Sequence, residues 1–306
     1  MLNQHSQARR RSLTWLASLF ASGELLAAPT LNKQVEVTYP SPESATDSRY
    51  VYDWEVLRKA LERTRQRFGD FQLQASQEHM SAARVSQEMN TANGRINVMV
   101  RATSLELEQK LRPIRIPVDR GLLGYRIFLI RRADLPRFAT ITELEQLKQF
   151  RVGQGRGWAD VSILASSGLT VVEGASYEGL FGMLQMNRFD FFSRSTDEAL
   201  RELDERQSQL PDITVEPSLA LYYPLPRYFF VRRDADGDKL AQRISAGLEM
   251  MVRDGSLLAL FHQYKGSLIE RAGLSKRRLL RIANPNLSPE TPLERQELWY
   301  NPLTGK

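Results

Sequence analysis

The feature that most constrains the fold of this chain is a regular alternation of short β-like runs with longer helical runs. Residues 35–39 alternate apolar and polar side chains with period two, and a helical apolar face then runs from Trp54 to Phe68 and closes at Gly69. The same pattern predicts further strands at residues 71–74 and 96–100 and a helix between them at 81–90. Because parallel strands need a crossover connection, usually a helix, this rhythm predicts a parallel sheet with helices on its faces.

The alternation starts again near residue 140, which predicts a second sheet. Thr142–Glu145 and Ser195–Glu198 each have the form of a capping box that opens a helix. Further strands are expected at 151–153, 169–172 and 188–192, and further helices at 160–167, 176–186 and 195–207. Two strand-like runs, 122–130 and 219–223, flank this series and would let the chain leave a first lobe, build a second and return.

The expected fold is therefore α/β, with two lobes of mixed, mostly parallel sheets flanked by helices and two crossover strands as a hinge. The boundaries that follow are 29–122 for the first part of lobe 1, 123–223 for lobe 2, and 224–306 for the second part of lobe 1 with a C-terminal extension. The tail from Leu279 has no clear periodicity, so we expect an extended strap on the surface of the first lobe, although its aromatic residues could equally dock a partner.

Composition narrows the chemistry of the chain. Among its 306 residues there is no cysteine, and the three histidines are His5, His79 and His262, none of them in a motif. Thiol nucleophiles, disulfides and cysteine-based zinc sites are excluded, and we expect no metal and no cofactor. The net charge is +6, but no basic stripe is interleaved with aromatic residues, so nucleic acid binding is not expected.

Residues 1–28 have the pattern of an export signal. Arg9–Arg11 form a positive start, Leu13–Ala21 form the apolar stretch, and small residues follow. A retained amphipathic helix is the alternative. With no later run of 18 apolar residues, we expect a mature protein in a bacterial periplasm.

Four segments in order resemble the type II periplasmic solute-binding proteins, in particular the family-3 group that includes the amino-acid binding proteins of ABC transporters. These segments are Ile114–Val118, Leu144–Gly157, Gly182–Asp190 and Leu248–Gly255. The resemblance covers most of the mature chain. It implies a two-lobe fold that closes around a small molecule and is recognised by an inner-membrane permease or sensor.

Three departures from the family concern the ligand. The family's carboxylate-binding arginine would fall near Glu108 or Gln109. Its amine-binding aspartate would fall on Ser195, beside Arg194, and its glycine-rich opening is replaced by residues 39–43. Recognition of a standard α-amino acid is therefore not implied.

Arg194 is the leading candidate for ligand binding. It is expected between the end of a strand and the N-terminus of the helix that Ser195 opens, where guanidinium and free backbone N–H groups could hold an anion. The alternative is a solvated structural bridge from Arg194 to Glu198 or Asp197. An anion anchor of this kind predicts that Arg194→Ala weakens binding and leaves the melting temperature of the free protein nearly unchanged.

A glycine-rich loop over residues 153–160 is the second candidate, and it lacks the spacing of a nucleotide-binding loop. Trp158 could stack on a ligand and Arg156 could pair with it, while Asp160 is expected to cap the following helix. Tyrosines at strand ends or loops could border the cleft or simply pack. The full set of expected ligand-binding residues is Arg194, Ser195, Trp158, Arg156, Tyr39, Tyr125 and Tyr177.

The function that follows is capture of a small polar solute, with an anion as one candidate, by a monomeric periplasmic protein that presents it to an ABC-type transporter. One alternative is a ligand sensor acting on a membrane signalling partner. The other is an enzyme, since a cyclohexadienyl dehydratase uses the same fold. No pair of carboxylates is spaced for acid/base work, so we do not expect an enzyme.

Overall fold

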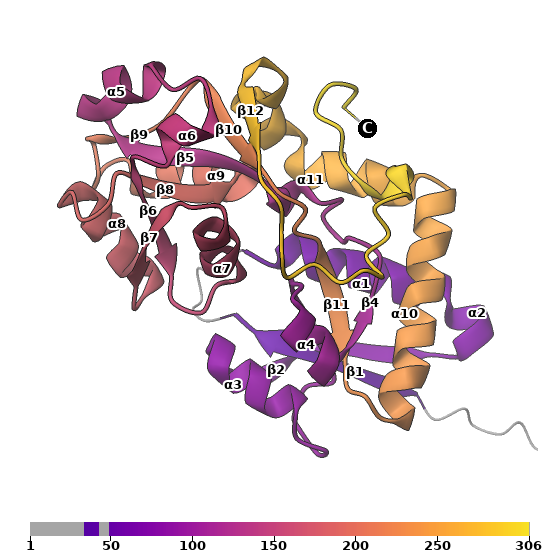
Figure 1. Ribbon diagram of the computed structural model, residues 1–306. Coiled ribbons are helices and arrows are strands. Elements are labelled where there is room, and N and C mark those ends of the chain that lie inside the picture. The colour runs from indigo at the N-terminus through magenta and orange to yellow at the C-terminus, as the bar shows by residue number, and fades with distance from the viewer. Residues whose placement is uncertain (1–33, 43–48, 306) are drawn as a thin grey trace, which may run out of the picture. The chain divides into compact units, whose positions relative to one another are not determined.

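The computed structural model describes residues 34–42 and 49–305, and the export signal predicted over residues 1–28 lies outside them. No described helix is both long and apolar enough to cross a membrane. The described chain is built on three sheets with helices against them (Figure 1).

The largest sheet has seven strands in the order β12-β10-β5-β8-β6-β7, with β9 also paired to β5. Strand β6 is parallel to β7 and β8, β10 is parallel to β12, and β5 is antiparallel to β8, β9 and β10. Its strands are β5 (Tyr125–Arg131), β6 (Arg151–Gly155), β7 (Thr170–Gly174), β8 (Phe191–Ser195), β9 (Ile213–Val215), β10 (Leu219–Tyr222) and β12 (Arg278–Arg281). The helices within this part are α5 (Leu135–Ala139), α6 (Leu144–Leu147), α7 (Ala159–Ser166), α8 (Tyr177–Gln185) and α9 (Thr196–Arg206).

Two smaller sheets make up the rest. Strands β3 and β4 pair antiparallel with β11 between them, and β1 pairs with β2 in parallel. The strands are β1 (Val35–Ser41), β2 (Phe71–His79), β3 (Val98–Ala102), β4 (Arg112–Ile114) and β11 (Arg227–Val231). The helices are α1 (Val51–Arg63), α2 (Arg65–Phe68), α3 (Ala82–Met89), α4 (Leu105–Lys110), α10 (Ala235–Arg253) and α11 (Ser256–Ala272).

The first predicted sheet is thus divided in two, and Asn97 supplies the reason. At the start of β3 its amide Oδ1 accepts a hydrogen bond from Thr38 N at 2.9 Å, while its own N–H donates to Thr38 O at 3.0 Å. A side chain therefore takes one of the positions that a backbone partner would fill, and β1 lies beside β3 without a regular ladder.

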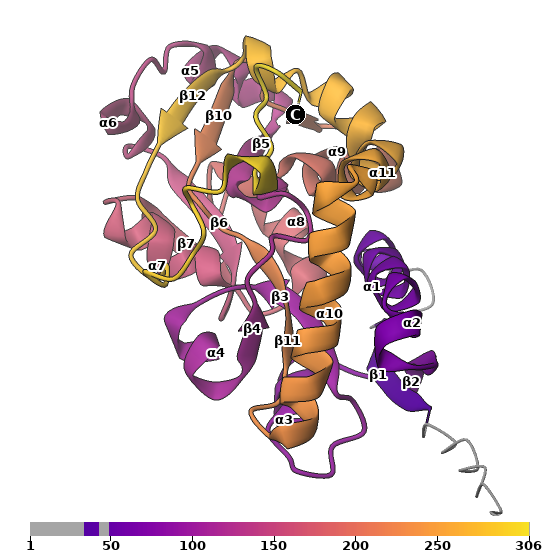
Figure 2. The same ribbon diagram turned by 90° about the vertical axis from the view of Figure 1, so that its right-hand side faces the viewer.

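Helices α1 and α10 pack closely beside the small sheets (Figure 2). Gly247 of α10 makes this approach possible, because a Cβ atom there would lie only 2.1 Å from the carbonyl oxygen of Ala60 in α1. Val56, Leu57 and Leu61 of α1 are fully buried against this interior. The apolar face predicted from Trp54 to Phe68 is therefore a packing face, although the helix breaks at Thr64.

Three sequence predictions need correction. The strand expected at 188–192 runs instead from Phe191 to Ser195, because residues 188–190 form a bend that turns Asp190 back to Arg151. The first capping box is formed by Glu143 and Gln146 rather than from Thr142, and the second, Ser195 with Glu198, is confirmed.

The C-terminal tail is the third correction. Arg278–Arg281 does not run over the small sheets but pairs in parallel with β10, as the edge strand of the large sheet (Figure 1). Beyond Arg281 the tail leaves the large sheet and reaches α10, where Arg295 forms a salt bridge with Glu249. The segment Arg-Leu-Leu-Arg has no period-two alternation that would predict a strand, and its pairing depends on β10 being an open edge.

Candidate functional site

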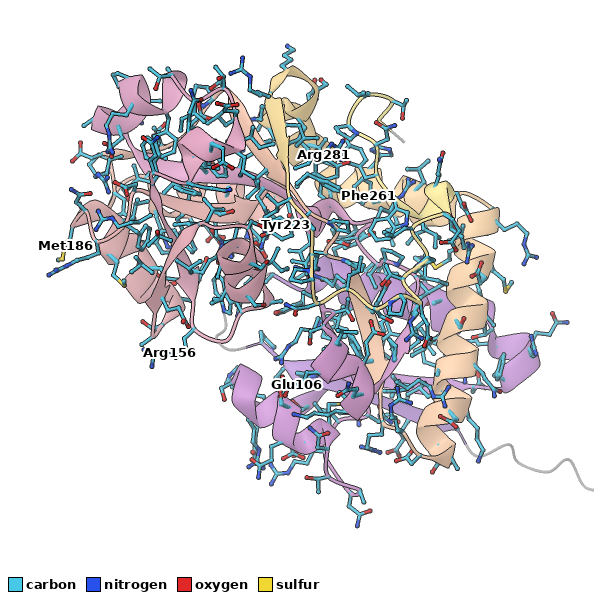
Figure 3. The ribbon with its side chains drawn as sticks, in the orientation of Figure 1. Glu106, Arg156, Met186, Tyr223, Phe261 and Arg281 are labelled. Atoms are coloured by element: carbon cyan, nitrogen blue, oxygen red, sulfur yellow. The ribbon has the colours of Figure 1, made fainter. Side chains whose placement is uncertain are left out.

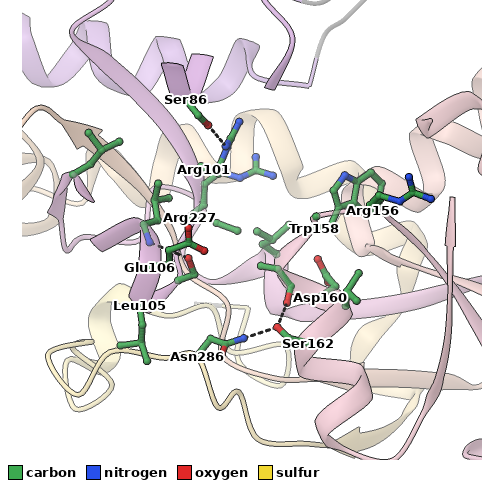
Figure 4. A pocket seen from close by; sticks show the side chains of 18 of the residues that line it. Ser86, Arg101, Leu105, Glu106, Arg156, Trp158, Asp160, Ser162, Arg227 and Asn286 are labelled. Carbon is green, nitrogen blue, oxygen red and sulfur yellow. Dashed lines mark hydrogen bonds between the residues drawn. The ribbon is translucent and has the colours of Figure 1, made fainter. Parts of the chain in front are cut away.

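A cavity of about 810 Å³ lies between the large sheet and the small sheets. From the large-sheet side it is lined by the loop between β6 and α7 and by residues of β5, β8 and α9. From the other side it is lined by Tyr50, by the ends of β3 and β11, and by α3 and α4 (Figure 4). Arg156 and Glu106 mark the two sides in Figure 3.

The lining contains more basic than acidic side chains. Seven are basic, namely Arg49, Arg101, Lys110, Arg126, Arg156, Arg194 and Arg227, and four are acidic, namely Glu106, Asp160, Glu173 and Glu198. A cavity with an excess of basic side chains attracts anions. The contribution of each basic side chain depends on whether an acidic side chain of the protein already neutralises it.

Arg126 of β5 is the most buried of these cations, with 1% of its surface exposed. Its Nε donates to the hydroxyl of Tyr223 at 2.9 Å, and its Nη2 donates to Asp160, which also accepts from Tyr223. Its Nη1 is buried without a hydrogen-bond partner in the described chain and lies 3.8 Å from Oε2 of Glu198. Carboxylates of the protein therefore neutralise most of the charge of Arg126.

Glu198, at the first turn of α9, lies between three guanidinium groups. Its carboxylate oxygens are 3.2 Å from Arg194, 3.6 Å from Arg227 and 3.8 Å from Arg126. Burial alone would raise the pKa of Glu198, but these cations lower it to about 2. Glu198 is therefore charged at neutral pH and neutralises part of the positive charge around the cavity.

Arg194 lies within β8, and its charge is met by the protein itself. Nε and Nη2 donate to the carboxylate of Glu202 at 2.9 and 2.6 Å, and Nη2 also faces Glu198. The guanidinium lies 4.8 Å from the ring centroid of Trp158. Burial works against the charged form, yet the two carboxylates raise the pKa of Arg194 above its usual value. The predicted bridge to Glu198 is thus confirmed, but it is buried rather than solvated.

Two other predicted residues line the cavity. Trp158 and Arg156 both come from the loop between β6 and α7, and Arg156 is exposed. Asp160 was expected to cap α7, but Trp158 stands at that cap position and Asp160 turns to Arg126 and Tyr223. The prediction for Asp160 is therefore wrong, because a buried arginine close by is a stronger partner than helix N–H groups.

The remaining four predicted residues are not among those that line this cavity. Ser195 donates its hydroxyl to Asp197 at 2.7 Å, and Tyr177 donates to Glu202 at 2.8 Å. Tyr125 is buried, its ring centroid lies 4.5 Å from that of Tyr222 with the planes tilted by 43°, and its hydroxyl donates to the backbone carbonyl of Tyr300. Tyr39 lines a second, smaller cavity. For Tyr177 and Tyr125, the packing alternative describes what the structure shows.

Arg126 and Arg227 also line the cavity, although neither is among the residues predicted from the sequence. Both lie in apolar strand runs, and a charged residue in a strand that is otherwise buried is a signal that could have found them. Arg227 forms a salt bridge with Asp53 of α1 at 3.3 Å. Within residues 34–42 and 49–305, no group of three or more His, Asp or Glu side chains is arranged to hold a metal ion.

Comparison with known proteins gives matches at the level of structure. No family model matches the chain, and no curated protein sequence matches it. An ancestral arginine-binding protein bound to arginine superimposes with a TM-score of 0.52 at 16% identity, over 75% of this chain and 97% of that one. A histidine kinase sensor domain similar to periplasmic binding proteins gives 0.52 at 17%, over 76% and 96%.

A third structure, from work on glutathione import through GshT and the cystine importer TcyBC of Streptococcus mutans, gives a TM-score of 0.54 at 12% identity, over 76% of this chain and 95% of that one. The chain has the fold of the type II periplasmic binding proteins. This confirms the α/β fold that the order of elements predicted.

Glu108 is one of the two positions, Glu108 or Gln109, near which the resemblance places the family's carboxylate-binding arginine. It is buried and accepts hydrogen bonds from Thr103 at 2.5 Å and from Arg115 at 2.7 Å. Glu108 therefore belongs to an internal ion pair with Arg115.

Proposed function

We propose that this protein is a periplasmic solute-binding protein that captures a small polar solute, with an anion as the favoured case, and presents it to an ABC-type transporter. The observation that supports this most is the cavity of about 810 Å³, which is lined from both sides and has seven basic side chains against four acidic ones. Ligand cavities in proteins typically measure about 300–1,000 Å³.

Capture would follow closure of two lobes. The predicted bounds are 29–122 with 224–306 for one lobe and 123–223 for the other, except that Arg278–Arg281 pairs with β10 and therefore belongs with the second lobe. Arg227 of β11 and Glu198 of α9 approach each other at 3.6 Å, so the two sides of the cavity share a charge contact. A solute that touches both sides stabilises the closed form more than the open one, and this difference drives closure.

A ligand sensor is the second candidate, because a histidine kinase sensor domain has the same fold. Cross-linking of the protein to solubilised inner membranes, followed by mass spectrometry, separates the two. Capture of permease and ATPase subunits supports transport, and capture of a kinase or cyclase supports sensing.

Binding is tested by thermal unfolding of the purified mature protein with amino acids, di- and tricarboxylates, polyamines, sugars and prephenate. A solute present at a hundredfold excess over its Kd stabilises the protein by about 2.7 kcal/mol, which is several degrees. Recovery of the solute unchanged supports binding, whereas its consumption would favour an enzyme. No shift with any solute would contradict the proposal.

Matched arginine variants locate the solute. Arg156 and Arg188 are both exposed, but only Arg156 lines the cavity. We expect Arg156→Met to weaken binding of an anionic solute and Arg188→Met to leave it unchanged. Equal effects of the two variants would place the solute outside this cavity.

A further inference from the structure

A second cavity of about 250 Å³ adjoins the large one, and it is of a different character. It shares Tyr50 and Arg101 with the large cavity. The rest of its lining comes mostly from β1, α1, β2, α3 and β3 and includes the apolar side chains Tyr39, Val51, Trp54, Met80, Val85, Met99 and Val100. The two cavities therefore meet at one tyrosine and one arginine.

The walls of the second cavity are aromatic and sulfur-containing. Tyr39 stacks on Trp54 with ring centroids 4.4 Å apart and planes at 25°. Met80 and Met99 are buried, with 3% and 1% of their surfaces exposed, and Val85 is buried beside them. Flat rings and flexible thioethers together suit a ring or a branched alkyl group.

The volume sets the size of that group. An apolar cavity of about 150 Å³ is large enough to bind benzene. A cavity of about 250 Å³ therefore takes a ring with a short substituent, and a small sugar or carboxylate would leave its apolar walls uncovered.

Arg101 indicates that the ligand carries a negative charge at the end opposite its apolar group. It is the one charged side chain among the described residues that line the second cavity, and its Nη1 donates to Ser86 at 3.2 Å (Figure 4). It belongs to β3, seven residues before Glu108, whose carboxylate is already held by Thr103 and Arg115. Ligand cavities typically combine an apolar wall with a few placed polar groups, and here the placed group is a cation.

We propose that the solute is an amphipathic organic anion, with its carboxylate at Arg101 and its ring or branched alkyl group in the cavity of Tyr39 and Trp54. This inference rests on the proposed solute-binding function and names the class of solute. The carboxylate reaches the large basic cavity through the shared position of Arg101, while the apolar part occupies the smaller one.

The test is isothermal titration of the mature protein with 3-phenylpropionate, indole-3-acetate and 4-methylvalerate. The primary amides of these three acids and the dicarboxylate succinate are titrated in parallel. We expect the acids to bind and the amides and succinate to bind at least about tenfold more weakly, because each lacks one of the two recognised features.

Two pairs of variants locate the binding. Arg101→Met should weaken binding of the acids about tenfold or more and Arg101→Lys less, while Arg112→Met, an arginine that lines neither cavity, should have no effect. Ala75 lines the second cavity from an exposed position of β2, so Ala75→Trp should block the ring, whereas Gln77→Trp on the same strand should not. Thermal unfolding without solute confirms that each variant is folded.

The outcomes separate the two proposals. Binding of succinate or of an amino acid, without binding of the apolar acids, overturns this inference and leaves the solute-binding function standing. Binding of the acids that Arg101→Met and Ala75→Trp do not affect also overturns it. Absence of binding by every solute tested overturns both.

Discussion

Arg194 holds the carboxylate of Glu202 with two nitrogens, Nε at 2.9 Å and Nη2 at 2.6 Å, and both side chains are buried. Tyr177 donates a further hydrogen bond to the same carboxylate at 2.8 Å. Arg194 lies in β8 of the large sheet, beside the cavity. The side chain that the sequence suggested as a ligand anchor is therefore buried, and the protein itself neutralises its charge.

Arg194→Ala should therefore destabilise the free protein, contrary to the expectation from sequence of an unchanged melting temperature. Removing one partner leaves the Glu202 charge buried and unpaired, which costs about 3–5 kcal/mol. Chemical denaturation measures this. Arg271→Ala is the control. Arg271 of α11 pairs with Asp204, which is on the same helix as Glu202, but both partners are about half exposed, so the loss should cost under about 1 kcal/mol. Equal effects of the two variants would contradict the prediction.

Glu198→Gln should raise the affinity of the cavity for carboxylates. The substitution removes the negative charge that lies within 3.8 Å of Arg194, Arg227 and Arg126, so more of their positive charge is available to a ligand. We expect a gain of about tenfold for an anionic solute and little change for a neutral one of the same shape. Titration calorimetry checks this, and a loss of anion affinity would show that Glu198 assists binding.

The same substitution should change how stability depends on pH. The pKa of Glu198 is lowered to about 2 in the folded protein, from 4.5, so its charge stabilises the fold above pH 4.5 and this contribution disappears as the pH falls toward 2. Glu198→Gln should therefore cost up to about 3 kcal/mol at pH 7 and much less near pH 2. Unfolding measured across this range tests it, and a cost independent of pH would contradict the assignment.

Asp119 should have the opposite effect to Glu198 on how folding stability depends on pH. Burial raises its pKa to about 6, from 3.8, with Asp53 and Asp197 adding to the effect and Arg227 opposing it. The folded protein therefore binds this proton more tightly than the unfolded chain, and stability from this group falls as the pH rises from about 4 to about 6.

Asp119→Asn tests this effect. The variant loses one of the two oxygens that accept hydrogen bonds from the backbone N–H groups of Gly121 and Leu123. This loss lowers the stability by the same amount at every pH, so it can be distinguished from the effect of titrating Asp119, which changes with pH. Relative to the wild type, we expect it to gain up to about 3 kcal/mol between pH 4 and pH 7. A difference between the two proteins that does not vary with pH would contradict a raised pKa at Asp119.

Gly121 should tolerate no side chain. Its φ is +71°, and a Cβ atom would lie 2.4 Å from the ring of Trp299 in the C-terminal tail. Gly121→Ala should cost about 2–4 kcal/mol, from backbone strain together with overpacking. Gly255→Ala is the control, because Gly255 has φ +75° and open space around it, so only the strain of about 1–2 kcal/mol applies. Thermal denaturation compares them, and equal costs would mean that Trp299 moves aside.

Elements whose signals lie within a few residues could be predicted from the sequence. Gly69 ends α2 with φ +79°, Ser176 caps α8 through Gly179 N, and Ser195 with Glu198 forms the predicted capping box. The order of these elements also predicted the fold that the similar structures confirm. Backbone hydrogen bonding and side-chain periodicity act over about one helical turn or a few strand residues, so a single sequence contains them.

The site depended on contacts between distant segments. Arg227 meets Asp53 across 174 residues, Arg126 meets Asp160 across 34, and β12 pairs with β10 at the edge of the large sheet. Which charges neutralise each other depends on where strands and helices stack and on how much water is removed around them. The sequence therefore determined the elements and their order. The tertiary structure decided which arginines are neutralised by buried carboxylates and which face the cavity.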